Sequence, residues 1–241
     1  MSNSGKVYLI PTVLYEENIE VLPTYILEAI KDCSAFFVEN EKTTRRYFKK
    51  LWKASLPGQD IVIDDYQWFT IHKAEEEVKK SFIQLLQQGK NIGIVSEAGC
   101  PGIADPGQIL IEAAQEIRAT VKPLVGPSSI LLALMASGMN GQSFQFNGYL
   151  PIDGLERKNA IKNLESDSYK RNSTQIFIET PYRNNALLKE IIDTCKPETK
   201  FCIALDITAS TEVIQTKKIK EWKNSIPDIH KRLAIFLLHA S

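Results

Sequence analysis

Apolar runs alternate with amphipathic segments through the first 138 residues of the chain. Short apolar runs typical of buried strands occur at 6–10, 35–39, 61–63, 91–96 and 120–126. Helical spacing of apolar residues occurs between and after them, at 23–33, 43–52, 74–89, 107–117 and 128–138. Because strands and helices alternate, this part of the chain is predicted to form a mostly parallel sheet with helices on both faces.

The pattern changes after Gly138. Strand-like runs now follow one another with one clear helix, at 184–195, and a short turn or helix near 220–222. The predicted strands are 144–151, 174–180, 200–208, 211–219 and 232–240. Consecutive strands without long crossovers favour antiparallel pairing. The predicted fold class is therefore α/β with two lobes, an N-terminal lobe at 1–125 and a C-terminal mixed α/β lobe at 126–241.

The segment IVSEAGCPGIADPG, residues 94–107, begins as a strand and ends at the start of a helix. Gly99 and Gly102 allow positive φ angles and a close approach of a ligand to the backbone. Asp105 is predicted to cap the following helix, with Pro106 at its first position. In open α/β sheets, ligands bind beyond the carboxyl ends of strands. This loop is therefore either part of a ligand site or a rigid connection without a ligand.

A second loop, VGPSSILLALM at 125–135, repeats the order of strand, glycine and helix start. Gly126 and Pro127 precede Ser128 and Ser129, either of which can begin the helix. If the two loops follow adjacent strands of one sheet, they face each other, and this favours a site for a small polar ligand. The sequence contains no GxGxxG motif after its first strand and no P-loop motif, so the usual dinucleotide and P-loop sites are not supported.

Charge, cysteine content and hydropathy narrow the possible classes. The 241 residues include 29 Lys and Arg and 29 Asp and Glu, and zero net charge argues against a strong non-specific hold on nucleic acid or membrane. The longest apolar run, 130–136, is far shorter than the roughly 20 residues of a membrane span. The four cysteines show no metal-like spacing, so we expect reduced thiols, a cytoplasmic location and no metal site.

Five segments together resemble the tetrapyrrole methylase superfamily, and within it the branch of ribosomal RNA small subunit methyltransferase I. They are VSEAGCPGIADPG (95–107), PLVGPSSILLALMASGM (123–139), FNGYLP (146–151), ERK (156–158) and IFIETPYRNNALLKEI (176–191). The resemblance implies a homodimeric methyltransferase that uses S-adenosyl-L-methionine, with the cofactor cleft between the two lobes. The implied acceptor is a ribose 2′-hydroxyl in the RNA of the small ribosomal subunit.

The segments on the substrate side depart from the branch pattern. The first loop, 11–18, lacks its glycine, the segment VENEKTT at 38–44 keeps only Glu39 of an acidic motif, and 64–73 contains only His72. The chain ends at Ser241, so it resembles a short form without the extra C-terminal domain. Two alternatives stay open: a methyltransferase acting on a tetrapyrrole or another small molecule, and a catalytically silent protein that binds the cofactor.

The resemblance also implies site residues. Those expected around the cofactor are Ala98, Gly99, Cys100, Ile103, Ser128, Ser129, Leu150 and Ile178. Pro11 and Leu14 are expected where the acceptor enters, and Arg183 either grips an RNA phosphate or pairs with Glu179. No catalytic base is assigned; Glu97 and Glu39 are the candidates, although a loop carboxylate often caps a helix or is solvated. The basic run 39–53 is read as an amphipathic helix, with an RNA-binding face as the alternative.

Overall fold

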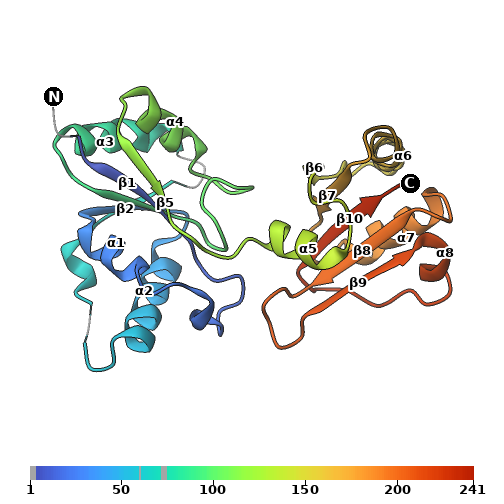
Figure 1. Ribbon diagram of the computed structural model, residues 1–241. Coiled ribbons are helices and arrows are strands. Elements are labelled where there is room, and N and C mark those ends of the chain that lie inside the picture. Colours follow the sequence, from blue (N-terminus) through green and yellow to red (C-terminus); the bar gives the residue numbers. More distant parts are fainter. Residues whose placement is uncertain (1–3, 60, 72–74) are drawn as a thin grey trace. The chain divides into compact units, whose positions relative to one another are not determined.

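A computed structural model describes residues 4–59, 61–71 and 75–241 of the chain. The chain divides into two compact units, Met1–Ser128 and Ser129–Ser241, which we call the N-terminal and C-terminal units. Each unit has its own five-stranded sheet (Figure 1).

The N-terminal unit is a parallel sheet with the strand order β3-β2-β4-β1-β5. Its elements are β1 (Lys6–Ile10), η1 (Ile19–Val21), α1 (Ile26–Asp32), β2 (Ala35–Val38), α2 (Glu41–Ser55), η2 (Ile63–Asp65), β3 (Gln67–Thr70), α3 (Glu75–Gln87), β4 (Ile92–Val95), α4 (Gln108–Glu116) and β5 (Thr120–Pro123). In the register of the central pair, Val7 lies opposite Ile92 and Ile10 opposite Val95.

Helices cover both faces of this sheet, α1 and α2 on one and α3 and α4 on the other (Figure 1). Side chains of a strand alternate between faces, so Tyr8 and Ile10 of β1 pack with α1 and α2, whereas Val7 packs with α3 and α4. All four residues of β2 and of β4 are buried, which explains their uninterrupted apolar runs. The predicted parallel sheet is confirmed.

The third strand lies at a different place from the one predicted. Residues 61–63 do not form a strand: Val62 is 63% exposed, and Ile63 begins the short helix η2. The strand is instead β3, where Trp68 packs against Phe36 and Phe69 stacks on Phe37 of β2. Contact between aromatic side chains thus outweighed the short β-branched run. The predicted first residue of the next helix, position 74, and His72 lie outside the described residues.

The C-terminal unit is a mixed sheet in the order β6-β7-β10-β8-β9. Only β6 and β7 are parallel; the other neighbours are antiparallel, as the closely spaced strands predicted. Its elements are α5 (Ser129–Ser137), β6 (Phe144–Tyr149), α6 (Gly154–Arg171), β7 (Thr174–Ile178), α7 (Asn184–Thr194), β8 (Lys200–Leu205), β9 (Val213–Lys218), α8 (Ile219–Trp222) and β10 (Ala234–His239). The predicted α/β fold class is confirmed.

Helix α6 was not predicted, because its buried face is partly polar. Ile161 and Leu164 are buried beside Glu165 and Ser168, so the apolar periodicity is weak. Glu165 is satisfied by tertiary contacts, since it accepts hydrogen bonds from the Lys196 backbone and the Thr199 hydroxyl. Across the described residues, no helix combines the length and apolar character that crossing a bilayer requires.

We predict that Phe36→Ala destabilises the N-terminal unit by about 3–5 kcal/mol, because it empties a core position. Phe36 is fully buried and contacts the rings of Phe48 and Trp68. Urea unfolding measures the change, with the exposed Val62→Ala as control, expected to stay within about 0.5 kcal/mol of the parent. Equal unfolding midpoints for the two variants would contradict this account of the core.

Candidate functional site

The candidate site lies where the parallel strands of the N-terminal unit end. Strands β4 and β1 are neighbours in the sheet. The connection that follows β1 runs towards β2 on one side of this pair, whereas the connection that follows β4 runs towards β5 on the other side. Where neighbouring strands have connections that diverge in this way, their carboxyl ends leave room for a ligand. The predicted residues Pro11, Leu14, Glu39 and Gly99 are all on loops that follow these strand ends.

The loop after β4 bends through left-handed conformations. Gly99 and Gly102 have φ angles of 73° and 76°, and Ala104 follows with 63°. The carbonyl of Gly99 accepts a hydrogen bond of 2.9 Å from the backbone N–H of Thr12, on the loop after β1. Glycine is thus required here both for the turn and for contact between the two loops.

Helix α4 begins later than predicted. Asp105 is not its N-cap and Pro106 is not its first residue, because the helix starts at Gln108 with Gly107 at the cap. Gly107 has a φ angle of 119° and provides no side-chain cap. The bend continues to the residue that tolerates this conformation, and the helix can start only after it.

The loop after β5 lies against the other two. A Cβ atom added to Gly126 would fall 2.1 Å from Cβ of Pro11, so only glycine fits there. The Cys100 sulfur lies 3.5 Å from the carbonyl oxygen of Pro127. The prediction that the two glycine-containing loops follow adjacent strands was wrong, because β1 lies between β4 and β5. The loops contact each other nevertheless.

Burial and the charge of Asp105 raise the pKa of the Cys100 thiol. The residue therefore stays a neutral thiol at neutral pH, which agrees with a lining role and not with a nucleophile.

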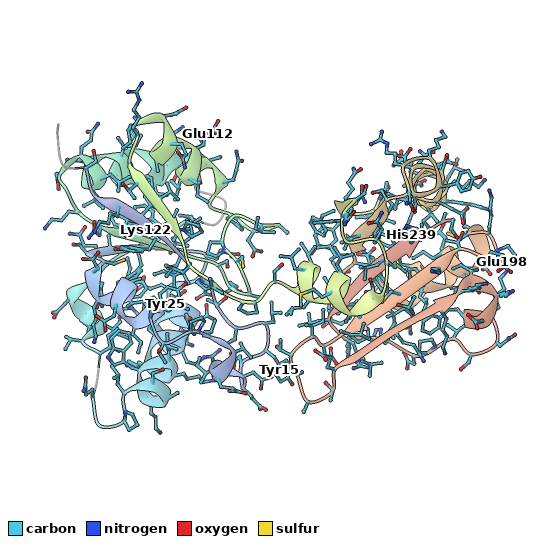
Figure 2. All side chains as sticks on the ribbon, in the orientation of Figure 1. Tyr15, Tyr25, Glu112, Lys122, Glu198 and His239 are labelled. Carbon is cyan, nitrogen blue, oxygen red and sulfur yellow. The ribbon has the colours of Figure 1, made fainter. Side chains whose placement is uncertain are left out.

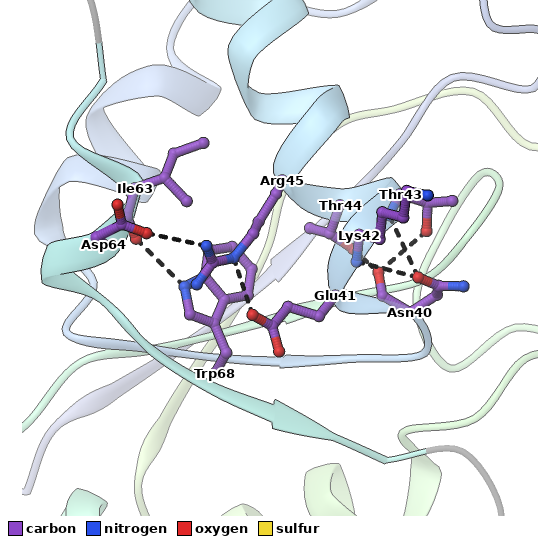
Figure 3. A network of polar contacts seen from close by, with 9 residues as sticks. All are labelled: Asn40, Glu41, Lys42, Thr43, Thr44, Arg45, Ile63, Asp64 and Trp68. Atoms are coloured by element: carbon purple, nitrogen blue, oxygen red, sulfur yellow. Dashed lines mark hydrogen bonds and ion pairs between the residues drawn. The ribbon is translucent and has the colours of Figure 1, made fainter.

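Both candidate bases, Glu97 and Glu39, lie at this edge of the sheet. The backbone N–H of Glu97 donates to Oε1 of Glu39 at 2.9 Å, and the Thr43 hydroxyl donates to Oε1 of Glu97 at 2.8 Å. Thr43 is in the first turn of α2, where the Asn40 side chain accepts from the N–H groups of Lys42 and Thr43 (Figure 3). The start of α2 thus provides a hydrogen-bond donor to the exposed Glu97 carboxylate.

A third carboxyl group belongs to the same region. Burial, together with the charges of Glu39 and Glu97, raises the pKa of Asp105 to about 7. Among the described residues, no group of three or more His, Cys, Asp or Glu side chains is arranged to hold a metal ion.

A cavity of about 170 Å³ opens beside these loops. Its lining is Thr12, Val13, Glu16, Ile19, Thr43, Thr44, Arg46, Tyr47, Lys50, Ser96 and Glu97. Thr12 is only 4% exposed, and its hydroxyl has no hydrogen-bond partner among the described residues, although buried polar atoms are normally paired. Burial raises the pKa of Tyr47, and its hydroxyl donates to the Pro11 carbonyl at 2.8 Å. The cavity therefore presents the Glu97 carboxylate to a polar molecule, whereas the Thr12 hydroxyl oxygen is buried in its wall.

Of the residues that line this cavity, Glu97 was predicted as a candidate base, Thr12 and Val13 lie within residues 11–14, where the acceptor was predicted to enter, and the α2 residues lie within the basic run 39–53. Thr12 and Thr43 carry no motif of their own. Only their position in the sequence could have indicated a role in the site, because Thr12 follows β1 and Thr43 lies at the start of the helix after β2.

The remaining predicted residues have varied surroundings. Ile103 is 55% exposed, whereas Leu150 is packed in the core of the C-terminal unit. Ile178 ends β7. Arg183 donates to Oε1 of Glu179 at 2.6 Å, so the ion-pair alternative holds in this structure. The other predicted cofactor residues lie on the loops or at the start of α5: Ala98, Ser128 and Ser129.

Comparison with known proteins assigns the class. Residues 21–223 match the family of tetrapyrrole (corrin/porphyrin) methylases, and the chain therefore belongs to this family of methyltransferases. A relative from Bacillus subtilis, ribosomal RNA small subunit methyltransferase I, is 32% identical over 226 residues, which cover 92% of this chain and 72% of the relative. The protein of that name from Vibrio cholerae is 28% identical over 214 residues, covering 89% of this chain and 69% of the relative.

Solved structures share the fold at low identity. A diphthine synthase has a TM-score of 0.67 at 12% identity, covering 98% of this chain and 90% of its own. Uroporphyrin-III C-methyltransferase from Thermus thermophilus, complexed with S-adenosyl homocysteine, has a TM-score of 0.54 at 13% identity, covering 98% and 97%. The methyltransferase CobJ has a TM-score of 0.61 at 15% identity, covering 99% and 95%.

We predict that Asp105 makes a contribution to the unfolding free energy that falls as pH rises from about 4 to about 7. A carboxyl group whose pKa is raised by folding keeps its proton in the folded chain after the unfolded chain has lost it, at about pH 4. Its stabilising contribution is present below that pH and is lost as pH passes the folded pKa. Urea unfolding across this range should give a flatter pH dependence for Asp105→Asn, but not for the exposed Asp193→Asn. Parallel profiles for the parent and Asp105→Asn would contradict the raised pKa.

Proposed function

We propose that the chain is an S-adenosyl-L-methionine-dependent methyltransferase that methylates a ribose 2′-hydroxyl in the RNA of the small ribosomal subunit. The observation that carries this proposal is the identity of 32% with the Bacillus subtilis ribosomal RNA methyltransferase over 92% of this chain. The uroporphyrin methyltransferase and CobJ share only the fold, at 13% and 15% identity, so a tetrapyrrole acceptor is not favoured.

Bound S-adenosyl-L-methionine supplies an activated methyl group on a sulfonium, which is transferred by in-line displacement. The task of the protein is to hold donor and acceptor in line and to exclude water, which can supply roughly 7–11 kcal/mol. The loop after β4 suits the donor, because its left-handed turn at Gly99 and Gly102 carries no Cβ atoms that would crowd a ligand. Ala98, Cys100, Ile103, Ser128, Ser129, Leu150 and Ile178 remain proposed cofactor contacts.

On the acceptor side, Glu97 is the proposed base. Its carboxylate lines the cavity and is oriented by the Thr43 hydroxyl. As the 2′-oxygen bonds to the methyl carbon and the carbon–sulfur bond breaks, the hydroxyl proton would pass to Glu97, and the sulfur product would leave neutral. The Glu39 carboxylate would position Glu97 by accepting a hydrogen bond from the backbone N–H of Glu97.

Four finer features belong to the proposal. A homodimer and a cytoplasmic location follow from the family resemblance and from a ribosomal substrate. Arg183 could bind a phosphate only after releasing Glu179, to which it is now paired. Pro11 and Leu14 would border the entry of the acceptor, since both follow β1.

Transfer of labelled methyl groups from S-adenosyl-L-methionine to undermethylated 30S subunits tests the function directly. Label in a ribose of the small-subunit RNA supports it. Label only in small molecules, or binding of the cofactor without turnover, would refute the RNA acceptor.

We predict that Gly99→Val weakens cofactor binding at least about tenfold, because a β-branched residue is strained at positive φ. Its Cβ would also lie 3.2 Å from the Leu14 side chain and from the Pro127 carbonyl. Gly58→Val is a matched control, since Gly58 has a φ angle of 84° but nothing within 4 Å of an added Cβ. Calorimetry with S-adenosyl-L-methionine measures both, and equal affinities would show that the loop is not the cofactor site.

We predict that Glu97→Gln lowers kcat about 10²–10⁴-fold and leaves cofactor affinity unchanged, because the amide cannot accept the hydroxyl proton. The exposed Glu112→Gln on α4, labelled in Figure 2, is the control and should retain activity. The measurement is methyl transfer to 30S subunits at saturating cofactor. Full activity in Glu97→Gln would exclude this residue as the base.

A further inference from the structure

Helix α2 presents a row of cations to solvent although the chain as a whole has no net charge. Lys42, Arg46, Lys49 and Lys53 are all exposed. Their spacing of four, three and four residues places them on one side of the helix. At a rise of 1.5 Å per residue, the row is about 16 Å long.

The opposite side of α2 belongs to the core. Its apolar residues, Tyr47, Phe48, Leu51 and Trp52, are all buried. The aromatic side chains that the sequence interleaves with the basic ones are therefore not free to stack on bases. They also cannot enter a lipid layer, which an interfacial helix requires of its apolar face. Any partner of the exposed side must be recognised through charge.

The cationic side chains of α2 differ in whether they already form ion pairs within the chain. Arg45 is fixed, because it pairs with Glu41 and Asp64 at 2.9 Å each and lies over the Trp68 ring (Figure 3). Lys42, Lys49 and Lys53, in contrast, form no ion pair with any described residue. We call these three the α2 lysines.

Arg46 and Lys50 connect the row to the cavity. Both line the cavity that contains Thr12 and Glu97, and both also line a surface hollow together with the α2 lysines. Each pairs with the carboxylate of Glu16, which is 63% exposed. A pair so exposed to water contributes little stability, so a phosphate group can displace Glu16.

We propose that this side of α2 is the surface on which the ribosomal RNA backbone docks, and that it leads the acceptor nucleotide to the cavity. This inference rests on the proposed function. The α2 lysines hold phosphates along the row, and a further phosphate replaces Glu16 at Arg46 and Lys50, beside the cavity. Contacts of this kind do not depend on base sequence, but they are strongly salt-dependent because they release counterions.

The first test replaces all three α2 lysines by glutamine and measures sedimentation with 30S subunits as a function of salt. We expect affinity to fall about 10–100-fold at low salt, and the slope of log K against log salt to become shallower by about two to three. Calorimetric affinity for S-adenosyl-L-methionine and the urea midpoint should not change, because these side chains contact neither the core nor the cofactor loop.

The matched control removes the same charge elsewhere. Lys158, Lys162 and Lys170 are exposed on α6 and form no ion pair with a described residue. Their replacement by glutamine should leave both the affinity and the salt slope at the parent values. Equal losses in the two triple variants would overturn the proposal, because they would reflect net charge alone.

A substitution that is expected to strengthen RNA binding adds a further test, because a folding defect would weaken binding. Glu16→Gln releases Arg46 and Lys50, so affinity for 30S subunits should rise about two- to fivefold and the salt slope should steepen by about one. Unchanged or weaker binding would overturn the role of Glu16 as the group that phosphate displaces.

The remaining outcomes separate this inference from the function it rests on. If the parent methylates 30S subunits but the α2 lysine variant binds and methylates them equally well, the docking surface is refuted and the function stands. If the parent binds 30S subunits through the α2 lysines without methylating them, the function is refuted and the docking surface stands. Loss of binding only to vesicles containing phosphatidylserine, with 30S binding unchanged, would identify a membrane surface and refute the RNA partner.

Discussion

The site depends on close contact between three loops at one edge of a parallel sheet. The Thr12 N–H binds the Gly99 carbonyl, and Gly126 leaves no room for a Cβ atom beside Pro11. Each loop follows a different strand, so their contact requires the strand order of the finished sheet. Glycine at these positions removes the steric barrier to contact between the loops.

Charged side chains cluster at the same edge of the sheet, although the net charge of the chain is zero. Burial, with the charges of the neighbouring Glu39 and Glu97, raises the pKa of Asp105 to about 7. Next to them, α2 carries exposed cations, and Glu16 pairs with two of these at the cavity. The Glu97 carboxylate suits proton removal, and the neighbouring cationic row suits a phosphate backbone. Zero net charge therefore does not argue against RNA here, because the charges are segregated locally.

The C-terminal unit shows how a family motif can also serve the fold. Leu150, predicted to contact the cofactor, is part of the hydrophobic core, and Arg183, predicted to bind substrate, pairs with Glu179. These contacts stabilise the unit by themselves, and the cofactor and substrate roles of the two residues stay proposals. In the N-terminal unit, Tyr25 (labelled in Figure 2) also has a structural role. Its hydroxyl accepts a hydrogen bond of 2.6 Å from the backbone N–H of Val125 and so anchors the loop after β5.

The sequence by itself determined the α/β class, most strands and helices, and the family, because apolar periodicity and glycine-containing loop motifs are local properties. It misplaced the third strand and missed α6, since aromatic packing on Phe36 and the hydrogen bonds of Glu165 arise only between distant segments. The start of α4 was wrong for a related reason: the bend continues to Gly107 because of the path of the loop. Only the tertiary structure joined Thr12, Thr43 and Glu97 around one cavity, because the order of parallel strands decides which loops meet.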